Sequence, residues 1–485
     1  LTGVGLSIAP LAYNPDPSSV DVVRSTGIGL TFNQRVSAGT GNVTLSLVAV
    51  GSTLVENFSV GSSVTYNNDA DPPNITINPT NDLSGNTVYA ISYPSGAFTQ
   101  SGAGGSFVGT AYTFATEKNQ YGELWVWGNN EYGVLAAGLA HDAHRSSPVQ
   151  IPGTNWKILS TGAGDNAYQI KAIKSDGTLW SWGRNSAGAL GLNETGGPGN
   201  AEASRSSPTQ VPGTNWAYVT GRYSVYATKT DGTLWAWAYN NYGQLGDNTV
   251  VYRSSPTQIP GTTWAQGRYK FTQGGSNVSA IKTDGTLWAW GYNNQGMLGL
   301  NEASPAHKSS PVQVGSDTTW KAVSSFLYGN IATKTDGTLW SWGFNQYGQL
   351  GVNDTTHRSS PIQVGTDTTW GNLNAAVSRY GVNAIKTDGT LWAWGNNTKG
   401  GMGGTGTRSS PTQIPGTTWK EIGIGDDGTR IAVKTDGTMW AWGDNAKGQL
   451  GQNNETEYNS PVQIPGTSWL SVSARRLMNM AIKQI

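Results

Sequence analysis

The chain has 485 residues, among them 66 glycines, 21 tryptophans and no cysteine, which excludes disulfides, thiolate nucleophiles and cysteine metal sites. Its 30 basic residues balance its 30 acidic residues, and charged residues make up only 12% of the chain. Net charge therefore gives no reason to expect a nucleic-acid partner. Since no apolar run approaches the roughly 20 residues that span a bilayer, membrane insertion is not expected either.

Residues 1–116 contain no tryptophan and alternate apolar and polar residues in short runs. Residues 29–32, 43–47, 74–77 and 112–114 are such runs, and clusters of Asn, Asp, Gly, Ser and Pro separate them. Short alternating strands that are spaced by turn residues predict an antiparallel β-sandwich.

Parts of this segment resemble the bacterial Ig-like domain of surface-layer and adhesin proteins. The resemblance rests on residues 30–36, 41–45, 81–89 and 112–116, so it covers nearly all of the segment. Domains of this family are usually spacers, stacking units or docking units. The resemblance therefore implies that this domain docks to a larger assembly or to a neighbouring copy. Residues 117–120 follow as a polar joint, too short to let two domains move far apart.

From residue 121 onward, one unit of 48 to 55 residues recurs. Residues 283–291, with the sequence TDGTLWAWG, show its signature. Asp-Gly between apolar runs predicts a β-hairpin, because a type I′ turn needs positive φ at both central residues. A period of this size indicates a solenoid, a propeller or an array. The leucine of the signature stands at Leu124, Leu179, Leu234, Leu287, Leu339, Leu391 and, as a methionine, Met439.

All the tryptophans belong to this repeat. Two come from each Leu-Trp-x-Trp motif, and they share one face of the strand while the residue between them is small in nearly every copy. Such a sheet can stack against identical neighbours, as propeller blades do. We therefore interpret the tryptophans as core, the alternative being a sugar-binding platform, and expect Trp288→Ala or Trp342→Ala to cost about 3–5 kcal/mol. The remaining tryptophan of each copy is Trp156, Trp216, Trp264, Trp320, Trp370, Trp419 or Trp469.

The repeat resembles the regulator of chromosome condensation family of seven-bladed β-propellers. The family pattern appears as DG at residues 336–337, WGFN at 342–345 and GQLG at 348–351, and the match spans residues 121–485. Three departures are local. Ala238 replaces a glycine in the third copy, residues 121–123 replace Thr-Asp-Gly in the first, and residues 401–404 distort the sixth.

The two ends of the repeat region predict how the ring closes. The first copy lacks the two strands that should precede its Leu-Trp-Val-Trp strand, and the chain ends with two such strands, residues 469–472 and 480–483. We predict that they complete the first blade beside residues 124–128, which removes an exposed sheet edge. The predicted fold is all-β: an Ig-like β-sandwich (residues 1–116), a short joint (117–120) and a seven-bladed β-propeller (121–485).

Catalytic and metal-binding patterns are not evident. His141 and His144, with Asp142, suggest a metal pair, but no third ligand accompanies them and we interpret them as a solvated loop. His307 and His357 are single loop residues. The aspartate of the Asp-Gly turn recurs in six copies, so it is not a tuned acid–base pair. We therefore predict no catalytic residue, no metal site and no cofactor.

A basic residue precedes the outer strand in six copies. A belt of positive charge suits an anionic partner, but such residues more often cap carbonyls or pair with nearby acids, in pairs worth roughly 0–1 kcal/mol each. We favour the second interpretation. The residues are Arg145, Arg205, Arg253, Lys308, Arg358 and Arg408, with Asn459 in the seventh copy.

Two sets of positions vary between the copies, one before each hairpin and one just after it. The start of a hairpin and its end lie opposite the Asp-Gly turn, so both sets crowd one face of the disc. We predict that this face contacts a protein or glycan partner, and the alternative is that its aromatics plug the central channel. The predicted contact residues are Arg222, Tyr223, Tyr239, Arg268, Tyr269, Tyr292, Phe326, Tyr328, Phe344, Arg379 and Tyr380.

These features predict a non-enzymatic structural or adhesive protein that is displayed outside the cell, on a phage virion (as a fibre, decoration or receptor-binding protein) or on a bacterial surface. One alternative is a secreted propeller that inhibits or scaffolds a partner enzyme. Another is the chromatin or GTPase-exchange factor that the family name implies. That role would need a basic tail or a distinctive exchange loop, and neither is evident.

Overall fold

A computed structural model of the chain divides into two compact units, Leu1–Asn119 and Gln120–Ile485. The described residues are 10–15, 22, 27–32, 35–48, 53–81, 83, 88–101, 110–115, 121–136, 143–160, 168–194, 204–302, 306–371, 373–377, 380–397, 406–425, 428–475 and 477–484.

The first unit consists of antiparallel strands in two four-stranded sheets and a two-stranded ribbon. One sheet has the order β1 (Pro10–Asn14), β2 (Ile28–Phe32), β7 (Asn74–Ile77) and β6 (Thr65–Asn67). The other has the order β10 (Thr110–Ala115), β8 (Val88–Tyr93), β4 (Asn42–Leu47) and β5 (Thr53–Ser59). The ribbon pairs β3 (Val36–Ala38) with β9 (Phe98–Gln100).

Alternation along the strands builds the core of this unit. Ile28, Leu30 and Phe32 of β2 are fully buried while the residues between them are half-buried, as the two-residue period of a strand requires. Ile75 and Ile77 of the neighbouring strand belong to the same hydrophobic cluster. The runs that predicted a sandwich are therefore the strands that bury its inner faces.

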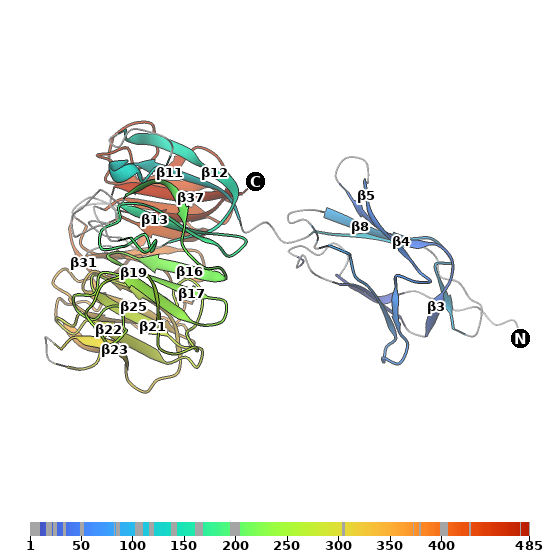
Figure 1. The fold of residues 1–485 in the computed structure, drawn as a ribbon, viewed down its shortest axis with the longest axis horizontal. Coiled ribbons are helices and arrows are strands. Elements are labelled where there is room, and N and C mark those ends of the chain that lie inside the picture. Colours follow the sequence, from blue (N-terminus) through green and yellow to red (C-terminus); the bar gives the residue numbers. More distant parts are fainter. Residues whose placement is uncertain are drawn as a thin grey trace, which may run out of the picture. The chain divides into compact units, whose positions relative to one another are not determined.

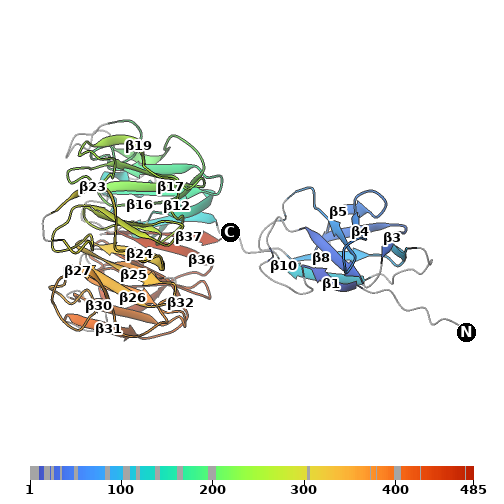
Figure 2. The ribbon, with the colours of Figure 1, turned by 90° about the horizontal axis from the view of Figure 1, so that it is seen from below.

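Five four-stranded antiparallel sheets make up most of the second unit, and we number them as the third to seventh blades. Successive sheets contact each other, and Figures 1 and 2 show their strands side-on, in layers. The third blade consists of β16 (Trp216–Gly221), β17 (Ser224–Lys229), β18 (Leu234–Ala238) and β19 (Arg253–Ile259), and the fourth of β20 (Phe271–Gln273), β21 (Asn277–Ile281), β22 (Leu287–Gly291) and β23 (Lys308–Gln313). The fifth consists of β24 (Trp320–Phe326), β25 (Gly329–Lys334), β26 (Leu339–Gly343) and β27 (Arg358–Gln363), and the sixth of β28 (Asn374–Val377), β29 (Gly381–Ile385), β30 (Leu391–Gly395) and β31 (Arg408–Ile414). The seventh consists of β32 (Trp419–Ile424), β33 (Arg430–Lys434), β34 (Met439–Gly443) and β35 (Tyr458–Ile464).

A seven-stranded sheet contains the first and second blades, which share the long strand β12. Its order is β15 (Arg205–Gln210), β14 (Leu179–Gly183), β13 (Gln169–Lys174), β12 (Arg145–Leu159), β11 (Gly122–Gly128), β37 (Met478–Gln484) and β36 (Trp469–Ala474). One end of β12 pairs with β11 and the other with β13. Counting β12 in both, the described strands correspond to seven four-stranded blades. One short 3-10 helix, η1 (Glu131–Gly133), follows β11.

The C-terminal strands close the ring as predicted. β37 pairs with β11 in antiparallel register, so that Ile482 lies opposite Leu124 and Met480 opposite Val126. Figure 1 shows these strands side by side. The N-terminal strand of the propeller therefore has neighbours on both sides, and the edge that would invite aggregation is covered.

The second indole of each Leu-Trp-x-Trp motif joins neighbouring blades. Trp290, which is fully buried, donates from Nε1 to the backbone oxygen of Gln244 in the preceding blade over 2.8 Å. The next glycine, Gly246, has φ +69°, and a Cβ there would lie 2.8 Å from the same indole nitrogen. The Gly-Gln-Leu-Gly motif thus brings backbone up to the indole where no side chain fits. The same bond is made by Trp127, Trp182, Trp237, Trp342 and Trp394.

The first indole of each motif is half-buried, and in six blades it packs closely on a lysine. The Lys282 ammonium lies 3.8 Å from the centre of the Trp288 ring and 5.2 Å from that of Trp264. A cation held over two indole faces is stabilised by their negative π-surfaces. The core interpretation is therefore confirmed in full for Trp342, which is fully buried, whereas Trp288 keeps one side in contact with solvent.

We expect the two substitutions to differ. Trp342→Ala removes an indole from the core between the fourth and fifth blades together with its hydrogen bond, and should cost about 3–5 kcal/mol. Trp288→Ala removes a half-buried ring and should cost less, about 1–2 kcal/mol. Urea unfolding of both variants tests this order. Equal losses of unfolding free energy in the two variants would show that burial of the indole does not determine the destabilisation.

Candidate recognition face

The Asp-Gly end of the propeller is nearly the same in six blades. In the fourth, Asp284 Oδ1 accepts hydrogen bonds from the backbone amide and hydroxyl of Thr286, over 2.9 and 2.6 Å. The Thr286 hydroxyl in turn accepts one from Trp288 Nε1 over 2.9 Å. Five other blades repeat these contacts, so this end offers little that distinguishes one blade from the next.

The opposite end carries aromatic rings that differ between blades. In the third blade, Tyr223 follows β16 and lies 6.1 Å, centre to centre, from Tyr239, which follows β18. Tyr252, which precedes the outer strand β19, lies 5.3 Å from Tyr239. The Tyr239 hydroxyl is 2.7 Å from the Ser186 hydroxyl of the second blade. These three rings therefore run from the inner to the outer strand of one blade.

The fourth blade carries a second cluster of aromatic rings. Tyr292 stacks on His307 at 4.7 Å and meets Tyr242, from the third blade, at 4.6 Å. Tyr242 also lies 5.1 Å from His307. Tyr242 is 39% exposed, so part of this cluster faces solvent.

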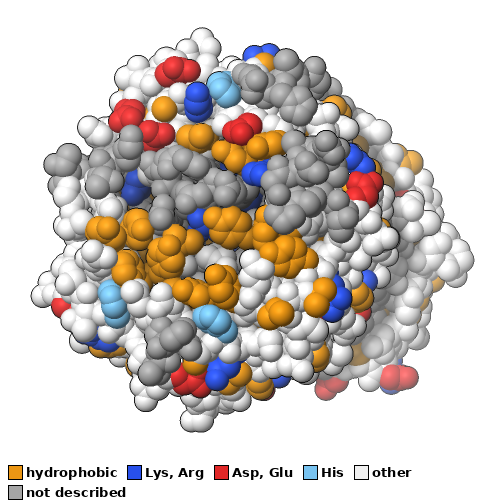
Figure 3. Space-filling view, turned by 60° about the vertical axis from the view of Figure 1, so that its left-hand side comes forward, with side chains coloured by type: hydrophobic (Ala, Val, Ile, Leu, Met, Phe, Trp, Pro, Cys, Tyr) orange, Lys and Arg blue, Asp and Glu red, His pale blue; other side chains and the backbone are white. Residues whose placement is uncertain are grey.

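The fifth and sixth blades carry a third cluster of aromatic rings. Phe344 stacks on His357 at 4.8 Å and lies 5.7 Å from Tyr328. Tyr347 of the fifth blade meets Tyr380 of the sixth at 4.7 Å. Figure 3 shows hydrophobic side chains gathered in a band across one face of the propeller, with histidines at its border. We call this set the aromatic face: Tyr223, Tyr239, Tyr242, Tyr252, Tyr292, His307, Tyr328, Phe344, Tyr347, His357 and Tyr380.

The structure brings six of the predicted contact residues into the aromatic face: Tyr223, Tyr239, Tyr292, Tyr328, Phe344 and Tyr380. Sequence reasoning missed the other five. A signal for two of them was present, because Tyr242 and Tyr347 stand directly before the first glycine of Gly-Gln-Leu-Gly.

Arg268 and Tyr269 lie elsewhere, and their predicted placement was wrong. They precede the inner strand β20, and the backbone oxygen of the next residue, Lys270, accepts from Ile281 at the Asp-Gly end of β21. Arg268 forms an ion pair with Glu421 of the seventh blade. The segment therefore joins opposite sides of the ring near the Asp-Gly end. The loop that corresponds to Arg222 and Tyr223 is residues 274–276.

Two further predicted residues are buried. Phe326 is only 1% exposed and packs in a hydrophobic cluster with residues of the fifth and sixth blades. Arg222 is 2% exposed, and its backbone oxygen accepts from Gln169 Nε2 over 2.8 Å. Both side chains are therefore buried beneath the aromatic face. Arg379 lies outside the described residues.

Other basic side chains are buried inside the propeller, and one of them joins two blades. Arg475, which follows β36, donates to the Ser160 hydroxyl over 2.6 Å. Burial, with the neighbouring Arg475 charge, lowers the pKa of Lys171 well below its ordinary value. Burial also lowers the pKa of Arg430 to about 10, which still leaves it charged at neutral pH. These contacts are internal to the propeller.

Three histidines occupy the same position in three blades, a regularity that the sequence interpretation did not recognise. Nδ1 of His144, His307 and His357 accepts the backbone amide of Asn130, Asn293 and Asn345 over 3.4, 3.2 and 2.9 Å. Each histidine directly precedes the basic residue that begins the outer strand. They therefore hold the outer loops rather than stand alone. His141 and Asp142 lie outside the described residues.

The basic residues of the outer strands pair with nearby acids, as the favoured interpretation predicted. Arg205 pairs with Glu194 at 2.6 Å and Arg253 with Asp247 at 2.9 Å. Arg358 pairs with Asp354 at 2.6 Å, four residues earlier. A fourth pair joins Lys308 to Glu302 at 2.9 Å. The belt is locally neutralised at these four positions, so it offers little free charge to an anionic partner there.

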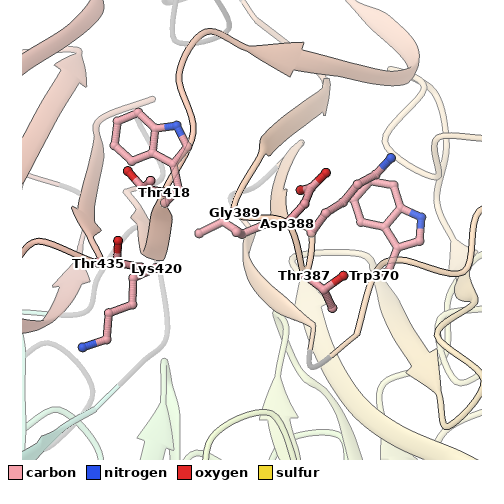
Figure 4. A pocket seen from close by; sticks show the side chains of 10 residues that line it. Trp370, Thr387, Asp388, Gly389, Thr418, Lys420 and Thr435 are labelled. Atoms are coloured by element: carbon pink, nitrogen blue, oxygen red, sulfur yellow. The ribbon is translucent and has the colours of Figure 1, made fainter.

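A cavity of about 450 Å³ opens at the Asp-Gly end between the sixth and seventh blades. Figure 4 shows Trp370, Thr387 and Asp388 on one side of it and Thr418, Lys420 and Thr435 on the other. Hydrogen bonds from the Thr390 hydroxyl and amide lower the pKa of Asp388. A carboxylate of this kind is a poor general acid or base at neutral pH. The cavity does not offer an acid–base pair.

No group of three or more acidic or histidine side chains among the described residues is arranged to hold a metal ion. No helix in the described ranges is long and apolar enough to cross a membrane.

Comparison with protein families confirms both resemblances that were read from the sequence. A profile described as RCC1-like domain matches residues 171–482. Another, described as bacterial Ig-like domain, matches residues 9–116.

Curated relatives match part of the chain. The chain is 26% identical to the ultraviolet-B receptor UVR8 of Arabidopsis thaliana over 294 residues, which is 58% of this chain and 62% of the receptor. It is 23% identical to the E3 ubiquitin-protein ligase HERC2 of Homo sapiens over 249 residues, 50% of this chain and 5% of the ligase. The chain thus spans less than two thirds of either protein.

Solved structures share the fold of the propeller. Human WBSCR16 matches with a TM-score of 0.64 at 20% identity, over 75% of this chain and 99% of that one. Yeast RCC1 (Prp20), in its complex with Kap60, matches with a TM-score of 0.63 at 19% identity, over 76% and 90%. At such identities the likeness supports the architecture alone.

The histidines of the aromatic face predict a pH dependence of stability. Burial lowers the pKa of His307 and His357 below the ordinary value of 6.5, and Nδ1 accepts an amide hydrogen only in the neutral form. Between the lowered pKa and 6.5 the unfolded chain binds more protons, so stability falls as pH falls. Their contribution is fully present above pH 6.5 and is lost as pH drops through the folded pKa.

Urea unfolding at pH 7.5 and pH 5 measures this effect. The difference in unfolding free energy between the two pH values should be larger for the parent chain than for a His307→Phe, His357→Phe variant. The ion pairs of the residues that follow the two histidines, Lys308–Glu302 and Arg358–Asp354, remain in both proteins and serve as the internal control. Equal differences would contradict the assignment.

Proposed function

The chain belongs to the family of RCC1-like domains, and from that premise we propose that it is a non-enzymatic binding protein whose propeller recognises a protein or glycan partner. The aromatic face is the recognition surface. The observation that carries this proposal is that rings gather at the one end where the blades differ, while the other end repeats the same contacts.

The chemistry of the face suits recognition. Tyrosine supplies large, rigid contact area at low entropic cost and hydrogen bonds through its hydroxyl, and it is enriched at binding hot spots. Tyr242, Val250 and Val251 are 39%, 60% and 54% exposed, so apolar surface remains available at the outer loops of the third blade. A partner with complementary apolar and hydrogen-bonding groups fits this surface better than a highly charged one.

Protein partners have precedent among the structural neighbours. Yeast RCC1 is recorded in complex with Kap60, and Prp20p has binding properties towards Gsp1p and histones. We do not assign those partners to this chain. A nucleic-acid partner is not favoured, because 30 basic residues balance 30 acidic ones.

We further propose that the Ig-like unit docks the propeller to a larger assembly or to a neighbouring copy, so that the whole is displayed outside the cell on a phage particle or a bacterial surface. The match of residues 9–116 to the bacterial Ig-like domain supports this setting. A secreted propeller that inhibits or scaffolds an enzyme is the second candidate. It would use the same aromatic face.

The alternative that the aromatics plug the central channel is less favoured for Tyr223. Its ring partners are Tyr239 and then Tyr252, so the row leads outward from the inner strand. The residues that do link opposite sides of the ring are Arg268 and Glu421, near the other end.

Double substitution tests the proposal. Tyr223→Ser with Tyr380→Ser removes one ring from the third blade and one from the sixth, and should abolish capture of a partner from the native source. The melting temperature should change little, because both rings are only half-buried.

The matched control is Asp231→Asn with Asp388→Asn, which alters the same two blades at the Asp-Gly end. This control should retain partner capture. If the tyrosine variant still captures the partner but melts at a lower temperature, Tyr223 and Tyr380 stabilise the centre of the propeller and the proposal is wrong.

A further inference from the structure

The closing blade lacks the turn that the other six share. In that blade β37 and β11 pair without a connecting turn, and Glu123 occupies the position of the turn threonine. Trp125 Nε1 consequently donates to Glu123 Oε2 over 3.1 Å. In every other blade the corresponding indole donates to a threonine hydroxyl.

The lysine of this blade is also withdrawn from its indoles. Lys483 Nζ lies 5.8 Å from the Trp125 ring centre and 5.7 Å from that of Trp469. In the other six blades the corresponding distances lie between 3.8 and 5.2 Å. The ammonium is therefore less engaged with the rings here than elsewhere.

A cavity of about 310 Å³ lies at this place, between the seventh and first blades. Its apolar walls include the rings of Trp125, Trp469 and two prolines, and its polar groups include the side chains of Gln452 and Lys483. Asn453 and Ser147 are exposed at its rim. The volume is at the lower end of the range for small-ligand sites.

We propose that this cavity binds an acidic saccharide unit, such as a hexuronic acid. An indole face packs against the C–H face of a sugar ring, since the π-surface is negative and those hydrogens are slightly positive. Amide and hydroxyl side chains offer both donors and acceptors, as vicinal sugar hydroxyls require. The site is distinct from the aromatic face.

The preference for an acid follows from the charges. Among the described residues, Lys483 contributes the one charged side chain that lines the cavity. No carboxylate among the described residues pairs with it, and its cross-strand neighbour Glu123 accepts from Trp125 instead. A sugar carboxylate would accept a charge-assisted hydrogen bond from the ammonium, which is stronger than a neutral one.

Ligand-observed NMR titration of the full chain with galacturonate, galactose and succinate tests the proposal. Galacturonate should bind saturably and about tenfold or more tightly than galactose, the ratio expected for one charged hydrogen bond. Succinate should bind more weakly than galacturonate. No binding of galacturonate, or equal binding of all three compounds, would overturn the assignment.

Variants locate the binding. Lys483→Met should weaken galacturonate binding about tenfold or more, whereas Lys282→Met, the same change in the fourth blade, should not. Asn453→Gly, which suits the positive φ there, should weaken it too, with Asn353→Gly in the fifth blade as its matched control. Equal effects of a variant and its control would overturn the site. The Tyr223, Tyr380 double variant should bind galacturonate normally, which separates this test from that of the aromatic face.

Discussion

The indole–carbonyl bond between neighbouring blades is the constraint on which the rest of the propeller depends. Trp127 of the first blade donates to Gln449 of the seventh over 2.7 Å, so the same bond that joins consecutive blades also joins the two ends of the ring. Two residues after the acceptor the backbone passes close to the indole in a positive-φ conformation, which is why glycines such as Gly451 recur there. Repeated packing of this kind leaves only the loops free to vary.

This difference between repeated packing positions and variable loops explains where function can reside. Strand centres and Asp-Gly turns are occupied by contacts that every blade needs, and a substitution there acts first on stability. The opposite end has no such common requirement, and it carries tyrosines, histidines and a phenylalanine in patterns that differ from blade to blade. The closing blade is the other exception, because no turn connects β37 to β11 and its lysine lies farther from its indoles.

The sequence predicted the features that repetition imposes. The strands, the core tryptophans and the pairing of the C-terminal strands with β11 follow from a motif that occurs seven times. It misplaced Arg268 and Tyr269 because their Gly-Arg-Tyr string matches that of Arg222 and Tyr223. In the fourth blade Lys282 lies 18 residues after Trp264, whereas in the third Lys229 lies 13 residues after Trp216, and the extra residues precede the inner strand. The shared role of the histidines was hidden because the asparagine to which each binds lies 14, 14 and 12 residues earlier.

Hydrogen exchange of the full chain, with and without a captured partner, tests recognition through the aromatic face most directly. Slower exchange on binding should be confined to the loops that carry Tyr223, Tyr239, Tyr292, Phe344 and Tyr380. The Asp-Gly turns at residues 231–232, 284–285 and 388–389 should exchange at unchanged rates. Protection of those turns with no change at the aromatic loops would contradict the account.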